Sequence, residues 1–289
     1  MPRQYCPILT GLEPMDQLVI RTYSPMPFNV GAIAVVGICA LVGSGRSHAD
    51  DVPSLTSAVT PYRPSVSTPA ALSAPGWLEI EAGVQSTGAE DPRRRESLPY
   101  TFKLAFTPDW GVRIGGDAVV RQRNADGSSL HGGGDTGIVL KRRFAVNDAS
   151  AFGLELGALF PTARSGLGND GHTNETLNGI YSSDFADNWH TDINLSTTHV
   201  GFVDQATSRW QQGWAAALSR NLTPQWGVVG ELSGTHQGGS GSTSQALVAA
   251  SYSVSPAMTL DLGFSKGLNA ASGKWSMFSG VTFLAAKLF

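Results

Sequence analysis

Residues 76–84 read GWLEIEAGV, and their side chains alternate between two kinds. The apolar positions are Leu78, Ile80, Ala82 and Val84, and two carboxylates, Glu79 and Glu81, stand between them. Successive side chains of a β-strand point to opposite faces, so this stretch predicts a strand with one apolar and one charged face. The apolar face must meet an apolar environment, and the carboxylates must meet water or partners.

The same period of two recurs along the chain. It is clear in residues 98–106, 112–120, 138–144, 152–160 and 258–264. It is weak in residues 176–183 and 244–253. No helical period appears after residue 50, so the pattern predicts an all-β protein.

The connections between these stretches alternate between tight and long. The tight ones are Thr107 to Trp110, Ala145 to Ser150, Asp184 to Asn188, Leu222 to Trp226 and Val254 to Ala257. Gly-, Ser- and Asn-rich loops lie near 86–97, 123–134, 161–175, 198–209, 234–244 and 267–273. The alternation predicts an antiparallel up-and-down transmembrane β-barrel of about twelve strands, with short periplasmic turns and long outer loops. The weak stretches leave ten strands as an alternative.

Composition separates this prediction from a soluble secreted β-sandwich, which would also alternate. Only 15% of the residues are charged, whereas about a quarter is usual in a soluble domain. The net charge of −3 and the lack of a long basic run exclude a nucleic-acid-binding surface. In a membrane barrel the apolar faces meet lipid, and Glu79 and Glu81 point into the lumen.

Aromatic residues support the membrane prediction, because they gather at the two membrane interfaces of such barrels. Trp77, Trp110, Trp189 and Trp226 stand beside predicted periplasmic strand ends. Phe289 matches the terminal aromatic residue that many outer-membrane barrels present to the barrel-assembly machinery. The expected partners are therefore outer-membrane lipid and that machinery.

The first fifty residues predict export. Residues 30–42 form an apolar run of signal-peptide length, and Ser47-His48-Ala49 suits cleavage by signal peptidase near Ala49. The presequence therefore covers residues 1–49, with Met26 as an alternative start. Residues 50–76 are rich in Pro and Ser and predict an extended leader, and residues 77–289 predict the barrel. Both cysteines, Cys6 and Cys39, precede the cleavage point, so the mature chain has none.

A set of charged residues shares the face opposite the apolar one and is predicted to line the lumen. These residues are Glu79, Glu81, Lys103, Arg113, Asp117, Arg121, Asp135, Lys141, Arg143, Glu155, Asp192, Glu231 and Asp261. If the turn after Phe144 is symmetric, Lys141 faces Glu155 on the adjacent strand. Such residues form either a constriction that selects solutes or a salt-bridge network that fills the barrel. Asp135 follows three glycines and has a further alternative role, capping a loop.

Arg142 and Lys287 are charged residues at positions where the alternation predicts the apolar face. Both lie near the periplasmic boundary, where basic side chains can snorkel.

Signals of catalysis are poor, and no enzyme activity, cofactor or metal is expected. His131, His172, His190, His199 and His236 lack a Ser two residues later, the spacing of outer-membrane phospholipases. The run GLGNDG at 166–171 fits a nucleotide-binding spacing but lies in a predicted outer loop without a following helix.

Three stretches resemble the outer-membrane family named for the meta-pathway of phenol degradation. They are the opening PYRPSVSTPAALSAPGWLEIEAGV at 61–84, GGGDTGIVLKRRF at 132–144, and LELGALFPT at 154–162. In the last, Phe160 replaces the usual Leu of a Leu-Pro-Thr corner. The resemblance implies a transporter-like barrel that passes small solutes passively, apolar or aromatic ones included. The alternative is a closed barrel with a structural or surface-interaction role, plugged by side chains or by residues 50–76.

Overall fold

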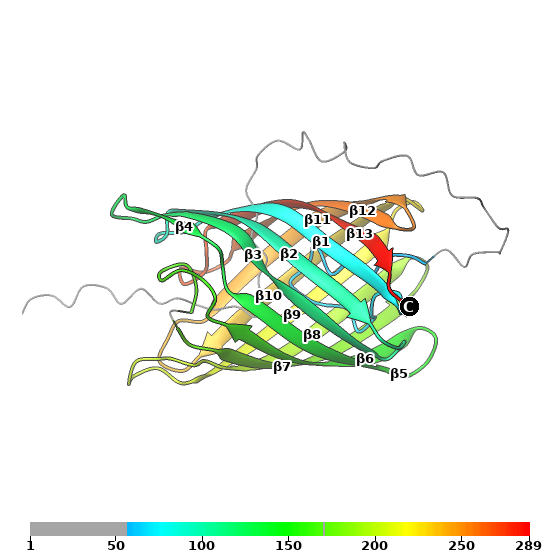
Figure 1. Cartoon of the computed structure of the whole chain (residues 1–289), viewed down its shortest axis with the longest axis horizontal. Coiled ribbons are helices and arrows are strands. Elements are labelled where there is room, and N and C mark those ends of the chain that lie inside the picture. The colour runs from blue at the N-terminus through cyan, green and yellow to red at the C-terminus, as the bar shows by residue number, and fades with distance from the viewer. Residues whose placement is uncertain (1–56, 170) are drawn as a thin grey trace, which may run out of the picture.

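The computed structural model describes residues 57–169 and 171–289, which form one antiparallel β-barrel (Figure 1). The predicted presequence lies outside these residues. Twelve strands make the wall, and the short strand β4 (Ser129–Gly132) pairs with the loop end of β3. The wall strands are β1 (Trp77–Gly88), β2 (Arg94–Ala105), β3 (Trp110–Arg123), β5 (Thr136–Ala145), β6 (Ser150–Phe160), β7 (Asn174–Phe185), β8 (Trp189–His199), β9 (Trp210–Asn221), β10 (Trp226–Gln237), β11 (Thr243–Ser255), β12 (Met258–Gly267) and β13 (Trp275–Lys287).

Each wall strand pairs with its neighbours, and β1 pairs with β13 to close the barrel. Closure matters because an open sheet edge would leave backbone N–H and C=O groups without partners in lipid. Residues 176–183 and 244–253, where the alternation is weak, lie in the full-length strands β7 and β11. The barrel therefore has twelve strands and not ten. Among the described residues no helix has the length and apolarity needed to cross a membrane.

The two ends of the barrel differ. All five predicted tight connections join strands at one end, here called the turn side, where the chain also enters β1 and leaves β13. The loops between the other strand ends define the loop side. Several of them are shorter than predicted, because β1, β2, β3 and β11 continue into residues expected to be loop.

The outer surface of the wall is apolar. Large hydrophobic side chains are exposed along it, among them Phe102, Ile114, Leu156, Leu195 and Leu262. The buried side chains are mostly polar, and Glu79 and Glu81 are at most 1% exposed. A soluble sandwich would bury the first group and expose the second. The exposed apolar belt belongs in a bilayer, and the protein is a transmembrane β-barrel of the bacterial outer-membrane type.

Aromatic residues mark the turn side of this belt. Trp77, Trp110, Trp189 and Trp226 each begin a strand there. The Arg142 guanidinium lies 4.9 Å from the ring centre of Trp110, and that of Arg220 lies 5.1 Å from Trp189. A cation over an aromatic face at a membrane interface is favourable. This contact accounts for Arg142 on an otherwise apolar face.

The strand pairings contain three register shifts, and two of them bear on the predicted faces. In β3 the pairing shifts between Ser97 and Pro99 of the partner strand, so one extra residue of β3 is accommodated. Beyond it Val120 is buried and Arg121 is exposed, so the prediction that Arg121 lines the lumen is wrong. A bulge exchanges the two faces of a strand, and side-chain periodicity does not reveal it. A second bulge lies where β13 pairs with Leu78 and Glu79 of β1. It shifts the pairing of β13 close to Lys287, the residue that breaks the predicted alternation of this strand.

Candidate functional site: a plugged lumen

The turn-side half of the lumen is occupied by residues 57–76, here called the plug segment (Figure 1, blue). The sequence predicted an extended leader without packing, but Ala70 and Ser67 are at most 1% exposed. Val59 N–H donates to the Pro256 carbonyl in a tight turn, and Pro75 forms a β-bridge with Ala105. The segment therefore rises from the turn side, bends inside the barrel and returns to the same side. Its four prolines, at 61, 64, 69 and 75, cannot donate to a strand ladder, so wall side chains satisfy much of its backbone.

The first wall contact of the plug segment is a pair of glutamates. Glu79 accepts a hydrogen bond from the Thr60 N–H at 3.0 Å, and Glu81 accepts one from the Tyr62 N–H at 2.7 Å. Lys103 Nζ lies 2.6 Å from Glu79 Oε1 and 2.5 Å from Glu81 Oε1. One lysine between two carboxylates lets these like charges stand on one strand, because buried charges need partners.

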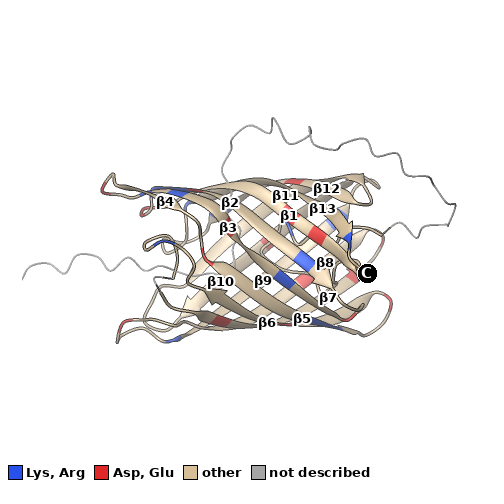
Figure 2. Ribbon diagram, viewed as in Figure 1, with Lys and Arg blue, Asp and Glu red and all other residues tan. Residues whose placement is uncertain are grey.

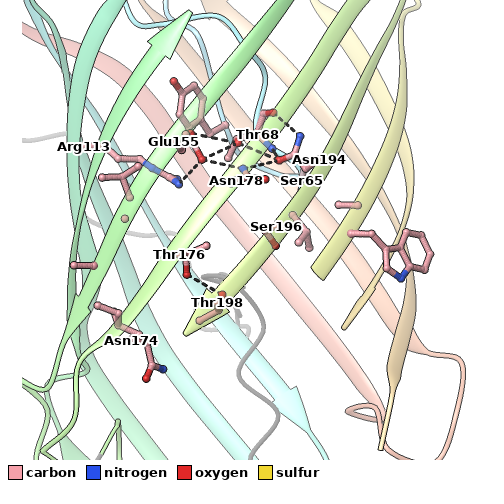
Figure 3. A pocket seen from close by; sticks show the side chains of 18 of the residues that line it. Ser65, Thr68, Arg113, Glu155, Asn174, Thr176, Asn178, Asn194, Ser196 and Thr198 are labelled. Carbon is pink, nitrogen blue, oxygen red and sulfur yellow. Dashed lines mark hydrogen bonds and ion pairs between the residues drawn. The ribbon is translucent and has the colours of Figure 1, made fainter. Parts of the chain in front are cut away.

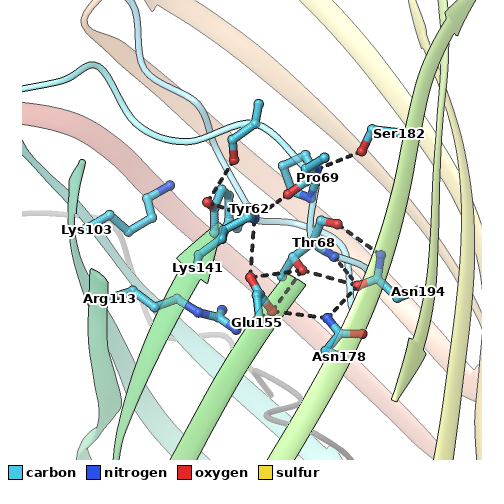
Figure 4. A network of polar contacts seen from close by, with 12 residues as sticks. Tyr62, Thr68, Pro69, Lys103, Arg113, Lys141, Glu155, Asn178, Ser182 and Asn194 are labelled. Atoms are coloured by element: carbon cyan, nitrogen blue, oxygen red, sulfur yellow. Dashed lines mark hydrogen bonds and ion pairs between the residues drawn. The ribbon is translucent and has the colours of Figure 1, made fainter. Parts of the chain in front are cut away.

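Tyr62 is the centre of a cationic cluster. Its ring centre lies 4.0 Å from Lys103 Nζ and 4.3 Å from Lys141 Nζ. Its hydroxyl donates to the Ala71 carbonyl at 2.9 Å and accepts from Lys141 at 3.0 Å. Figure 4 shows Tyr62 between the side chains of Lys103 and Lys141. Desolvated cation–π contacts contribute up to about 2 kcal/mol each, so Tyr62 is a main anchor of the plug segment.

Glu155 collects a second network in the middle of the barrel (Figure 4). Lys141 is its register partner on β5, as a symmetric turn after Phe144 predicts, and the two charged atoms are 3.2 Å apart. Arg113 and Asn178 also donate to Glu155, at 3.2 and 3.0 Å. Lys141 further donates to the Pro69 carbonyl of the plug segment. The network therefore joins four wall strands, β3, β5, β6 and β7, to the plug segment.

Two other carboxylates of the wall have the plug segment as their partner. Asp261 binds Arg63 through two contacts, at 3.1 Å to Nε and 3.0 Å to Nη2, and both side chains are about 95% buried. Glu231 accepts from the N–H groups of Val66 and Ser67 at 2.9 and 2.8 Å. The Ser65 and Ser67 hydroxyls also donate to it. No Lys or Arg among the described residues forms an ion pair with Glu231.

An amide clamp holds the bend of the plug segment. The Thr68 N–H donates to Asn194 Oδ1 at 2.8 Å, and Asn194 Nδ2 donates to the Thr68 carbonyl at 3.0 Å. The Ala70 N–H donates to Ser182 Oγ at 2.7 Å. The Asn194 side chain thus replaces the neighbouring strand that the plug backbone lacks.

The loop-side half of the lumen is mainly uncharged. Above the bend a cavity of about 100 Å³ is lined on one side by hydroxyl and amide groups of β7 and β8 (Figure 3). Val66, Val139, Leu159 and Trp214 also line it, and so do the charged side chains of Arg113 and Glu155 at the level of the bend. The buried inward-facing side chains toward the loops are Gln85, Ser97, Asn174, Thr198, Gln211, Ser233, Thr235, Gln237, Ser265 and Ser276. At about 15 Å³ per water, the cavity holds several waters or one small solute.

Four other residues predicted to line the lumen lie nearer its two ends. Asp117 pairs with Arg95 at 3.1 Å on the loop side. Asp135 accepts hydrogen bonds from the N–H groups of Ala163 and Asn169, so it organises the loop between β6 and β7. Arg143 lies 4.0 Å from Asp109 at a tight turn, and Asp192 is bonded by Ser182 and His190. Among the residues described, no three His, Cys, Asp or Glu side chains come together as metal ligands would.

Sequence reasoning predicts the Lys141–Glu155 pair and offers plugging by residues 50–76 as an alternative, but it does not identify which plug residues the wall charges bind. Between Asp51 and Glu79 the only charged residue is Arg63, and this isolated Arg was the available signal. Arg63 is a single cation in a Pro- and Ser-rich stretch, and the predicted lumen has more carboxylates than cations. This combination favours docking of the stretch on a wall carboxylate inside the barrel. Tyr62, Arg63 and Thr68 thus belong to the site although no strand pattern includes them.

Comparison with known proteins defines the class by fold. No family model and no curated protein matches the chain, so the likeness to the phenol meta-pathway family remains a prediction. A solved NanC porin aligns with a TM-score of 0.53 at 10% identity, covering 72% of this chain and 100% of that one. A KdgM porin in complex with disordered oligogalacturonate gives 0.49 at 10% identity, covering 72% and 99%. A CymD monoaromatic hydrocarbon channel gives 0.46 at 9% identity, covering 75% and 89%. At these identities the likeness concerns the fold, which is that of an outer-membrane β-barrel.

Proposed function

We propose that this protein is a gated outer-membrane channel for small solutes, closed on the turn side by its plug segment. The observation that carries the proposal is that a separate non-strand segment fills the turn-side lumen, docked among the side chains of the wall. Its contacts with the wall are hydrogen bonds, ion pairs and packing. A neutral hydrogen bond contributes about 1 kcal/mol net, and one to a charged group about 1.5–3 kcal/mol. Water can replace each of these bonds when the segment leaves.

The path of the plug segment supports a displaceable gate. Val59 and Pro75 both lie at the turn-side mouth, so the segment can leave as a loop without threading an end through the barrel. A closed structural barrel is the second candidate, favoured by the buried network around Glu155. The two differ in one respect: a gate conducts when the segment leaves, and a structural filling does not need to leave.

The lining bears on the class of solute. Thr176 and Thr198 already bond each other, and Asn174 Oδ1 accepts from the Gly201 N–H. A purely apolar hydrocarbon in the loop-side cavity would displace water from the hydrogen-bonding capacity that these bonds leave open, which costs free energy. The apolar side of the cavity at Val139 and Leu159 still accepts a hydrocarbon face. We therefore favour small solutes that carry hydrogen-bonding groups, aromatic ones included, over purely apolar molecules.

A reversible lock tests the gate. The chain has no cysteine after position 39, so Ala70→Cys with Ser182→Cys introduces a single cysteine pair. The Ala70 nitrogen of the plug segment lies 2.7 Å from Ser182 Oγ of the wall, and this contact is the reason for choosing the two positions. Barrels refolded from residue 50 onward, in planar bilayers, should conduct after reduction and stay closed after oxidation. Each single-cysteine variant is the control for thiol chemistry alone. Equal conductance in both states would refute the gate, and absence of conductance in every state would favour the structural barrel.

A further inference from the structure

The charges of the turn-side lumen divide into a self-sufficient set and a set that depends on the plug segment. Glu79, Glu81 and Glu155 stand against Lys103, Arg113 and Lys141, all on the wall, so three carboxylates meet three cations. Arg143 at the mouth is offset by Asp109. These groups keep their partners whether or not the plug segment is present.

Glu231 and Asp261 belong to the second set. The partner of Asp261 is Arg63 of the plug segment, and the partners of Glu231 are plug hydroxyl and N–H groups. Both carboxylates are at most 7% exposed while the segment is docked. When the segment leaves, they become unpaired negative charges on β10 and β12, separated by one strand.

A cationic side chain already occupies this face of the lumen. The Arg63 guanidinium makes two contacts with Asp261, which is the bonding that a planar organic cation makes with a carboxylate. Glu81, on the other side of β13 from Asp261, has an Oε2 atom buried without a hydrogen-bond partner among the described residues. Arg63 thus shows which ligand chemistry the site accepts, and Glu81 offers a further acceptor.

We infer that the open channel selects cationic solutes at two successive carboxylates, Asp261 and Glu231, which lie opposite Ser251 and Leu247 of β11, and that Arg63 occupies the Asp261 position in the closed state. The inference rests on the proposed gating. A small solute with a guanidinium or ammonium group would take the place of Arg63 as it passes. In a narrow lumen with low-dielectric walls, two carboxylates without cationic partners raise the local concentration of cations about tenfold or more.

The first variant of the test opens the channel of the full mature chain by substitutions in the plug segment alone. Tyr62→Ala with Arg63→Ala removes the largest side chain and the only cation of the plug segment. In a KCl gradient across a planar bilayer, the reversal potential of this variant should correspond to roughly tenfold preference for K⁺ over Cl⁻. Adding Glu231→Gln and Asp261→Asn should bring the ratio close to one while conductance persists. Adding Glu90→Gln, an 87% exposed side chain of an outer loop, should leave the ratio unchanged.

The outcomes separate this inference from the proposed function. Conductance without cation preference, or a preference that survives Glu231→Gln with Asp261→Asn, overturns the inference and leaves the gate standing. Heat-modifiable gel migration shows whether each variant is a folded barrel. A folded Tyr62→Ala, Arg63→Ala variant that never conducts overturns both.

Discussion

Glu231→Ala should unlock the plug segment, because this carboxylate holds the plug backbone at the level of the bend. It accepts from two plug N–H groups at 2.9 and 2.8 Å and from two plug hydroxyls. Hydroxyls can turn to other acceptors, whereas the two N–H groups cannot. Hydrogen bonds to a charged group contribute about 1.5–3 kcal/mol each, so docking should weaken by about 3–6 kcal/mol.

The assay for Glu231→Ala is single-channel recording at low voltage, which measures the ratio of open to closed time. Every 1.4 kcal/mol changes a population ratio about tenfold, so the lower bound predicts an increase of about 100-fold in that ratio. Glu231→Gln keeps one acceptor oxygen and should give an intermediate value. Ser233→Ala is the matched control, because it faces the lumen two residues further along β10 and is bonded by Gln245 of the wall. A folded Glu231→Ala barrel that stays as closed as the parent would refute this account of the anchor.

Three further predictions concern the wall and are read from urea unfolding of the barrel in lipid vesicles. Leu156→Arg, at a position 60% exposed on the apolar belt, should lower the free energy of unfolding by about 2–4 kcal/mol, and a neutral effect would place Leu156 outside the lipid. Arg142→Ala should cost about 1–2 kcal/mol through the lost contacts with the Trp110 and Phe144 rings, whereas Arg142→Lys should retain part of it. Ala186→Gly should raise stability by about 1 kcal/mol, because Ala186 has φ of 51° in a tight turn, where a Cβ atom is unfavourable. A loss of stability there would mean that lost chain stiffness outweighs relieved strain.

The wall could be predicted from the sequence because its causes are local. Side-chain period, turn composition and Trp positions all act within one strand or turn, and they place Glu79, Lys103 and Glu155 inside the barrel. Strands β7 and β11 were ambiguous because their outward positions include Gly179, Ala246 and Ala250, which carry little hydrophobic signal. Arg121 was misplaced because a single extra residue of β3 is absorbed as a bulge, and neither face pattern records it.

The plug segment could not be placed by local reasoning. Its residues have no period, and their partners lie up to 198 positions away, as Arg63 and Asp261 show. Such contacts exist only after the barrel has closed and brought seven or more strands around the segment. Composition alone gave an extended leader, which describes its backbone and omits its surroundings.

The distribution of charge along the lumen argues for a gate over a permanent filling. Buried ion pairs stabilise a fold little compared with apolar packing, because desolvation offsets most of their attraction. A barrel that needed only to be filled would be expected to use apolar side chains throughout. Here the fully buried charged groups of the wall, such as Glu79 and Lys103, stand where the plug segment docks. The half that it leaves free is lined mainly by neutral hydroxyl and amide groups and holds the less buried Arg95–Asp117 pair. Figure 2 shows charged bands toward both ends of the barrel.

Carboxylates such as Glu231 are the sharpest case of this arrangement. Without the plug segment its charge would be solvated by water in an open lumen, and with the segment it is solvated by N–H and hydroxyl donors. Both states therefore satisfy the carboxylate itself, whereas Glu231→Ala leaves the two plug N–H groups buried without an acceptor in the closed state alone, which is why the substitution should weaken docking. A reversible gate requires a residue whose charge has hydrogen-bond donors in both the closed and the open state. In a permanent filling, a buried carboxylate without a cation would pay for desolvation and gain nothing from the second state.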